Sequence, residues 1–185
     1  MSPSALRRLV GWTALGASVL YILSDLVELL GQGFSSAQLY ATYVAFVAVP
    51  FFVLGLHALQ GPRAGWLSLS GAVSYGVAFI FYAATAVHAL VAGTSDYAAL
   101  VGALGTLYTV HGGLLVVGGV LFGVAAVRAG VWPRWTGVGL IIGALLSLLF
   151  YLLRLPDTAQ VAGSTIRNVA FIGMAAAALR GGATP

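Results

Sequence analysis

The sequence contains no cysteine and no lysine. Without cysteine, disulfides, thiolate nucleophiles, cysteine-bound zinc and iron–sulfur clusters are excluded. Without lysine, a retinal Schiff base and any other lysine-based covalent chemistry are excluded as well. All eight basic residues are therefore arginines.

Charge of either sign is also scarce. A soluble domain carries about 25% charged residues, whereas only 6% of these 185 residues are charged and 61% are hydrophobic. This composition predicts an integral membrane protein surrounded by membrane lipids. The net charge of +4 does not indicate a nucleic-acid partner, because the arginines lie between apolar runs, where they set membrane topology. Homo-oligomerisation stays open.

Six apolar runs of about 20 residues each have the length that a hydrocarbon core of about 30 Å requires. The first run lacks an A-x-A-like cleavage site, so we expect a retained span rather than a signal peptide. The predicted fold is an all-α polytopic membrane protein with one domain over 1–185. Because each odd-numbered span opens with Arg and Trp, three tandem helical hairpins are one version of this fold. The expected spans are 9–30, 37–59, 65–91, 105–127, 135–155 and 159–179.

Short polar segments predict where the helices begin. Ser35 followed by Gln38 has the spacing of a capping box and predicts the start of the second span. Ser95 or Asp96 is expected to cap the helix that follows, and its first turns, residues 97–104, are expected at the membrane interface. Pro50 predicts a kink in the middle of the second span.

The arginines predict the topology. Most of them fall at the two termini or in the second and fourth loops, which lie on one side of a six-span protein. The positive-inside rule then places both termini in the cytoplasm, with the protein in the cell inner (plasma) membrane. The arginines in question are Arg7, Arg8, Arg63, Arg128, Arg134 and Arg180.

Two of the four acidic residues, Asp25 and Glu28, lie inside the first apolar run. Because they are three residues apart, they share one face of a helix. An ionisable side chain at membrane depth costs roughly 2.5–3.5 kcal/mol and normally faces protein, water or a partner group. We therefore expect both side chains to face the interior of the bundle.

With the topology above, five of the six spans place ionisable side chains in the outer half of the membrane. Besides the acidic pair, these residues are His88, His111, Arg154 and Arg167, with Tyr108, Tyr151 and Asn168 close in depth. His57 is the exception, because it lies near the cytoplasmic end of the second span. We interpret His57 as an interfacial histidine with a hydrogen-bond partner.

The first functional hypothesis is an acid–base site that binds, and converts, a small apolar or lipid-like molecule. Its candidate catalytic residues are Asp25, Glu28 and His111, since carboxylates and imidazoles exchange protons with a bound substrate. A guanidinium group would hold an anionic head group. The candidate substrate-binding residues are Arg167, Asn168, Tyr108, Tyr151 and Arg154.

The second hypothesis is a metal or haem protein. Glu28, His88 and His111 are ligand types for zinc or non-haem iron, with Asp25 as a further oxygen donor. His88 and His111 would alternatively be the axial ligands of a haem. No HExxH or ExxH spacing occurs, so the cofactor stays unassigned.

The third hypothesis is a small transporter or an accessory or scaffold protein in which the polar cluster is purely structural. Asp25 or Glu28 would then pair with Arg167, and Arg154 with Asp157. Such contacts join membrane helices at about 0.6 kcal/mol each on average. These three hypotheses leave open whether the protein is an enzyme.

Four short segments resemble those of small multi-spanning bacterial membrane proteins. They are SDLVE at 24–28, VPFFVLGLH at 49–57, YTVHGG at 108–113 and PRWTG at 133–137. The proteins resembled form an uncharacterised family defined by a domain of unknown function. This resemblance implies a six-helix membrane protein over nearly the whole chain and implies no particular activity.

Overall fold

The computed structural model describes residues 2–153, 155 and 157–181, and in this part of the chain all regular structure is helical. Six of its helices are long and apolar enough to cross a membrane, which confirms a multi-pass, all-α membrane protein. A single 3₁₀ turn, η1 (Gly61–Arg63), joins α2 to α3. The helices are α1 (Pro3–Gly31), α2 (Ser36–Leu59), α3 (Gly65–Ala92), α4 (Tyr97–Leu104), α5 (Thr106–Ala129), α6 (Arg134–Leu152) and α7 (Asp157–Arg180).

The predicted helix caps are confirmed. The Ser35 hydroxyl accepts a hydrogen bond from the Gln38 backbone N–H at 3.2 Å, and α2 begins one residue later. The Asp96 carboxylate accepts one from the Ala99 N–H at 2.8 Å and caps α4. Asp96 also accepts a hydrogen bond from the Ser95 hydroxyl, and these donors hold the pKa of Asp96 below its usual value.

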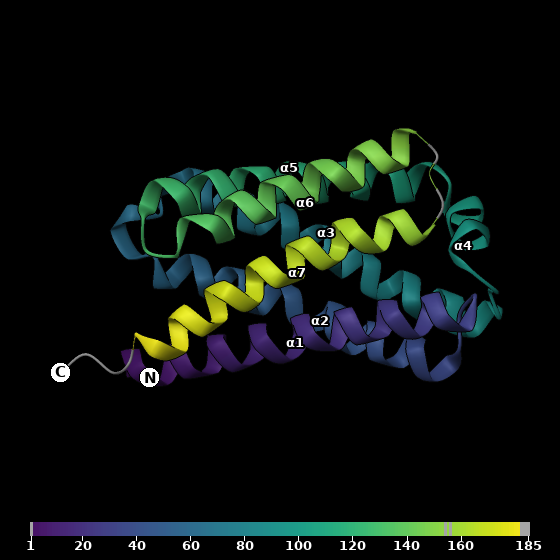
Figure 1. Ribbon diagram of the computed structural model, residues 1–185, viewed down its shortest axis with the longest axis horizontal. Helices are drawn as coiled ribbons and strands as arrows, with labels where there is room; N and C mark the ends of the chain where they lie inside the picture. Colours follow the sequence, from purple (N-terminus) through teal and green to yellow (C-terminus); the bar gives the residue numbers. More distant parts are fainter. Residues whose placement is uncertain (1, 154, 156, 182–185) are drawn as a thin grey trace.

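The six long helices form a closed ring. Each packs against its neighbours along the chain, with α3 directly against α5, and α1 packs against α7 to close the circle. Consecutive spans therefore lie side by side, as tandem hairpins require. Figure 1 shows α1 beginning and α7 ending at one end of the bundle, called here the terminal end, and α4 at the opposite end, called the α4 end.

Aromatic side chains fill the interior of the helix ring. Phe52 of α2 and Tyr75 of α3 both pack against Phe171 of α7, with ring centroids 5.0 and 5.6 Å apart. Tyr75 in turn packs on Phe79 at 5.0 Å. Because these rings reach across from α2 and α3 to α7, they close the lumen between the two ends of the bundle.

Glycines bring α3 and α5 into backbone contact. A Cβ atom at Gly71 would lie 2.4 Å from the Phe122 nitrogen, and one at Gly118 would lie 2.5 Å from the Tyr75 nitrogen. Only glycine fits at such distances, because a methyl group there would overlap the facing backbone. The glycine-rich fourth span thus packs tightly against the third over this part of its length.

Candidate functional site

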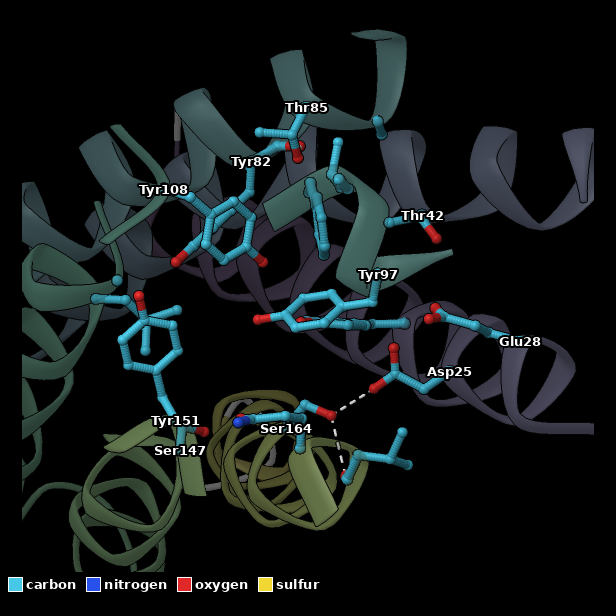
Figure 2. Close-up of a pocket in the computed structure, with 18 of the residues that line it drawn as sticks. Asp25, Glu28, Thr42, Tyr82, Thr85, Tyr97, Tyr108, Ser147, Tyr151 and Ser164 are labelled. Atoms are coloured by element: carbon cyan, nitrogen blue, oxygen red, sulfur yellow. Dashed lines mark hydrogen bonds between the residues drawn. The ribbon is translucent and has the colours of Figure 1, made fainter. Parts of the chain in front are cut away.

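A cavity of about 320 Å³ lies at the α4 end of the bundle, lined by residues from all seven α-helices. Its size is within the range of small-molecule pockets, roughly 300–1,000 Å³. We call it the α4-end cavity. Figure 2 draws 18 of its lining residues, which approach the same space from different helices; ten of them are labelled.

Small side chains create this cavity. At the terminal side, Tyr75 and Phe79 fill the lumen. One or two turns further toward the α4 end, the lining includes the small residues Thr42, Ala86 and Gly112, which cannot reach across the helix ring. The space therefore follows from a change in side-chain volume along the same helices.

Asp25 joins α1 to α7. Its carboxylate accepts a hydrogen bond from the hydroxyl of Ser164, which also lies 3.0 Å from the Val161 carbonyl oxygen (Figure 2). Both Asp25 and Ser164 line the cavity. Asp25 thus faces the interior of the bundle, as predicted.

Glu28 lies one turn further along α1, beside a polar cluster between α1 and α2. Its carboxylate accepts a hydrogen bond from the side-chain amide of Gln38 at 3.2 Å. The same amide nitrogen lies 3.0 Å from the Thr42 hydroxyl, which is hydrogen-bonded to Ser24. Glu28, Gln38 and Thr42 all line the cavity, so this cluster forms one of its polar walls.

Arg167 is the cationic residue of the cavity lining and is only 4% exposed. Its Nη1 atom donates hydrogen bonds to the Ser147 hydroxyl and, at 3.2 Å, to the Gly143 carbonyl oxygen, both in α6. Its Nε atom has no hydrogen-bond partner among the described residues. The described hydrogen bonds of Arg167 thus lead to α6 and to Tyr75 of α3, and not to Asp25 or Glu28 as the structural hypothesis expected.

Tyrosines form the wall opposite the acidic residues. The rings of Tyr82 and Tyr108 lie 5.3 Å apart, and Tyr97 of α4 packs edge-on against Tyr108 at 5.6 Å. The Tyr151 hydroxyl is hydrogen-bonded to Thr109 at 2.7 Å, which links α6 to α5. The wall is therefore largely apolar, with hydroxyl groups at defined points.

Five of the predicted site residues come together in this cavity. All five lie in the α4-end half of their helices, as their predicted shared depth requires. They are Asp25, Glu28, Tyr108, Tyr151 and Arg167. Arg154, and the proposed contact between it and the Asp157 side chain, lie outside what the structure describes.

His88, His111 and Asn168 are not among the described residues that line the cavity. His88 is exposed on α3 and lies about 100° around the helix from the buried Ala89. Asn168 is buried and donates a hydrogen bond to the Ser164 carbonyl oxygen at 3.0 Å. These side chains lie at the depth of the cavity, but on faces of their helices that do not line it.

His111 packs on the outside of the α3–α5 contact. Its ring stacks on Phe81 at 3.8 Å, and its Nδ1 atom lies 2.8 Å from the Leu107 carbonyl oxygen. Within the described part of the chain, no three His, Asp or Glu side chains form a group able to hold a metal ion. The expected set of Glu28, His88 and His111 is therefore not assembled, and His111 does not join the two carboxylates.

His57 has the hydrogen-bond partner expected of it, since its Nδ1 atom lies 3.0 Å from the Ser68 hydroxyl. The cavity also contains polar residues that the sequence analysis did not select, including Gln38, Tyr97, Ser147 and Ser164. Ser164 carried a usable signal, because it precedes Arg167 by three residues and so shares its helix face. Gln38 was interpreted only as part of a helix cap.

No family model, curated protein or solved structure matches this chain. The resemblance to an uncharacterised bacterial membrane family therefore stays a prediction. The cavity and its side chains are the basis on which a function is assigned.

Proposed function

We propose that this membrane protein binds a small, largely apolar molecule with one polar group in the α4-end cavity. The main support is the cavity itself, a space of about 320 Å³ whose walls are mostly aromatic and aliphatic. Pockets for small molecules typically combine such walls with a few placed polar groups. The buried Arg167 is the group on which the proposal depends most.

The polar groups suit a ligand that both accepts and donates hydrogen bonds. Arg167 carries donor groups beyond those bonded to α6, and its Nε atom has no partner among the described residues. Asp25 and Glu28 of α1 supply acceptor oxygens to the same cavity (Figure 2). A hydroxyl, carbonyl or carboxyl group on an aliphatic or aromatic body would match this arrangement.

Chemical conversion of the ligand would require proton exchange with a group that faces it. Asp25 and Glu28 are the candidates, because both line the cavity. His111 is left out of this role, since its ring packs on Phe81. We propose binding as the function, with proton transfer by a carboxylate as the chemistry available if the ligand is converted.

We further propose that both termini face the cytoplasm, so that the cavity opens toward the outer half of the inner membrane. The support is that most of the arginines lie at the terminal end, and arginines are enriched on the cytoplasmic side of membrane proteins. The cysteine-free chain allows a direct test with the single substitutions S2C and S95C. In intact cells a membrane-impermeant maleimide should label the S95C variant and not the S2C variant, and the reverse pattern would overturn the orientation.

Ligand binding is tested by extracting the protein, purified in a mild detergent, with organic solvent and identifying small molecules by mass spectrometry. The variant G112L fills the cavity, because a Cβ atom at Gly112 meets only the Tyr82 hydroxyl, at 3.5 Å. G16L is the matched control, since a Cβ atom at Gly16 meets nothing within 4 Å and Gly16 lies away from the cavity.

We expect a near-equimolar small molecule in the wild type and in G16L, and its loss from G112L. Equal amounts in all three proteins would mean that the molecule is bound elsewhere. No molecule above the detergent background in the wild type would contradict the proposed function.

A further inference from the structure

The cavity reaches the outer surface of the bundle in one direction. Among the described residues that line it, the exposed ones all lie on α5 or α6, whereas the lining residues of the other helices are buried or half-buried. The exposed lining residues are Thr109, Gly113, Leu148, Tyr151 and Leu152. The wall between α5 and α6 is therefore the thin side of the cavity.

Glycine spacing explains why this wall is thin. Toward the terminal end, α5 and α6 are in close contact, since a Cβ atom at Gly123 would lie 2.7 Å from the Gly137 carbonyl oxygen. One turn nearer the cavity on α5, a Cβ atom at Gly119 would lie 3.0 Å from that of Ala144. At Gly113 a Cβ atom would meet nothing within 4 Å. The contact between α5 and α6 thus opens toward the α4 end.

Among the described residues, one hydroxyl pair joins α5 to α6 at this opening. The Thr109 and Tyr151 hydroxyls are 2.7 Å apart, and both side chains line the cavity and are exposed. Gly113 lies one turn from Thr109 on the same face of α5. A hydrogen bond between two neutral groups is a weak closure, so the two helices can separate here without breaking a packed core.

The surroundings of the opening are apolar. Leu152, 66% exposed, and Leu148, 37% exposed, form its α6 side, and Val110 of α5 is 53% exposed nearby. Apolar side chains on the outside of a membrane-spanning bundle face lipid chains. In contrast, α4 covers the cavity from the end of the bundle, where its Leu100 is buried against Leu39 and Ala89.

We propose that the ligand enters and leaves the cavity sideways from the bilayer, through the opening between α5 and α6 at Gly113, with the Thr109–Tyr151 hydrogen bond as its latch. This inference rests on the proposed function and narrows the ligand class. The ligand is a molecule that dissolves in the membrane, such as an aliphatic or aromatic alcohol, and not a water-soluble metabolite that would arrive through α4.

The test follows the entry of a membrane-dissolved photoprobe, a decanol that carries a diazirine, into protein reconstituted in phosphatidylcholine vesicles. The chain contains no native cysteine, so G113C offers one thiol at the opening. Benzyl methanethiosulfonate attaches a bulky group to this thiol, and a reductant removes it. G16C is the matched control, because Gly16 is exposed on α1 and a Cβ atom there meets nothing within 4 Å.

The readout is the rate and the final level at which peptides containing Tyr82 or Tyr108 become photolabelled. We expect benzylation of G113C to slow probe entry at least tenfold, and reduction to restore the rate. Benzylation of G16C should change neither quantity.

Unchanged entry into benzylated G113C, with normal labelling of the cavity, would overturn the lateral route and leave the proposed function standing. A lower final level at an unchanged rate would also overturn it, because the benzyl group would then be occupying the cavity instead of its entrance. No labelling of cavity peptides in any unmodified protein would contradict the proposed function itself.

Discussion

The hydroxyl of Ser164 in α7 donates a hydrogen bond to the carboxylate of Asp25 in α1, joining the first and last spans at the wall of the cavity. The contact bridges residues 139 positions apart in the sequence. It closes the polar side of the helix ring and gives a half-buried acid a defined position.

Replacing Ser164 with alanine should destabilise the protein by about 1–2 kcal/mol, because a carboxylate at membrane depth loses its hydroxyl donor. The measurement is the free energy of unfolding in mixed detergent micelles. S70A is the control, since Ser70 is exposed on the same bundle and should tolerate the change. If S164A and S70A unfold alike, the Asp25–Ser164 bond makes no net contribution.

Arg167 and Asp25 should be energetically coupled, because opposite charges that line the same buried cavity attract one another. R167M leaves the carboxylate without a nearby cation, so D25N should cost less in the R167M background than in the wild type. We expect a coupling energy of about 1 kcal/mol in a double-mutant cycle of unfolding free energies. Strictly additive effects would mean that the two charges do not interact.

Much of the fold was predictable from the sequence because its signals are local. Ser35 and Asp96 cap the helices expected of them, since a cap depends only on a side chain and the next turn. The six spans follow from hydrocarbon thickness and run length alone. The helix that contains the first expected span begins before residue 9, because Ser2 caps α1 and Pro3 suits its first turn.

The candidate site was predictable in depth but not in direction. Depth follows from counting along a span, and it correctly grouped Asp25, Glu28 and Arg167. Direction depends on which face of each helix meets its neighbours, and helices that are apolar on all sides carry little periodicity to show it. His88 and His111 lie at the depth of the cavity but on other faces of their helices, so the expected imidazole side chains do not line it.

Y151F should speed exchange of the diazirine decanol probe about fivefold. Loss of one neutral hydrogen bond lowers the free energy needed to separate α5 from α6 by about 1 kcal/mol, which corresponds to a roughly fivefold faster opening. The same vesicle assay measures it, with Y40F as control, because Tyr40 is 63% exposed on α2 and lies away from the opening. Identical exchange rates for Y151F and wild type would show that the Thr109–Tyr151 pair is not a latch.

Gly118 should not tolerate even alanine. A Cβ atom there would lie 2.5 Å from the Tyr75 nitrogen and 3.0 Å from the Gly71 carbonyl oxygen, so α3 and α5 would be forced apart. We expect G118A to lose at least about 1–3 kcal/mol, the usual cost of overpacking, whereas G16A should lose much less. Thermal unfolding in detergent compares the two, and similar melting temperatures would contradict the close helix contact.

A crystal structure of the protein, from crystals grown in a lipidic mesophase, would test directly whether a ligand occupies the α4-end cavity. We predict non-protein density in the α4-end cavity, with a polar atom within hydrogen-bonding distance of Arg167 and an apolar body between Tyr82 and Tyr108. A cavity that holds only ordered water, or one closed by Arg167 turning onto Asp25, would contradict the proposed function and favour a purely structural polar cluster.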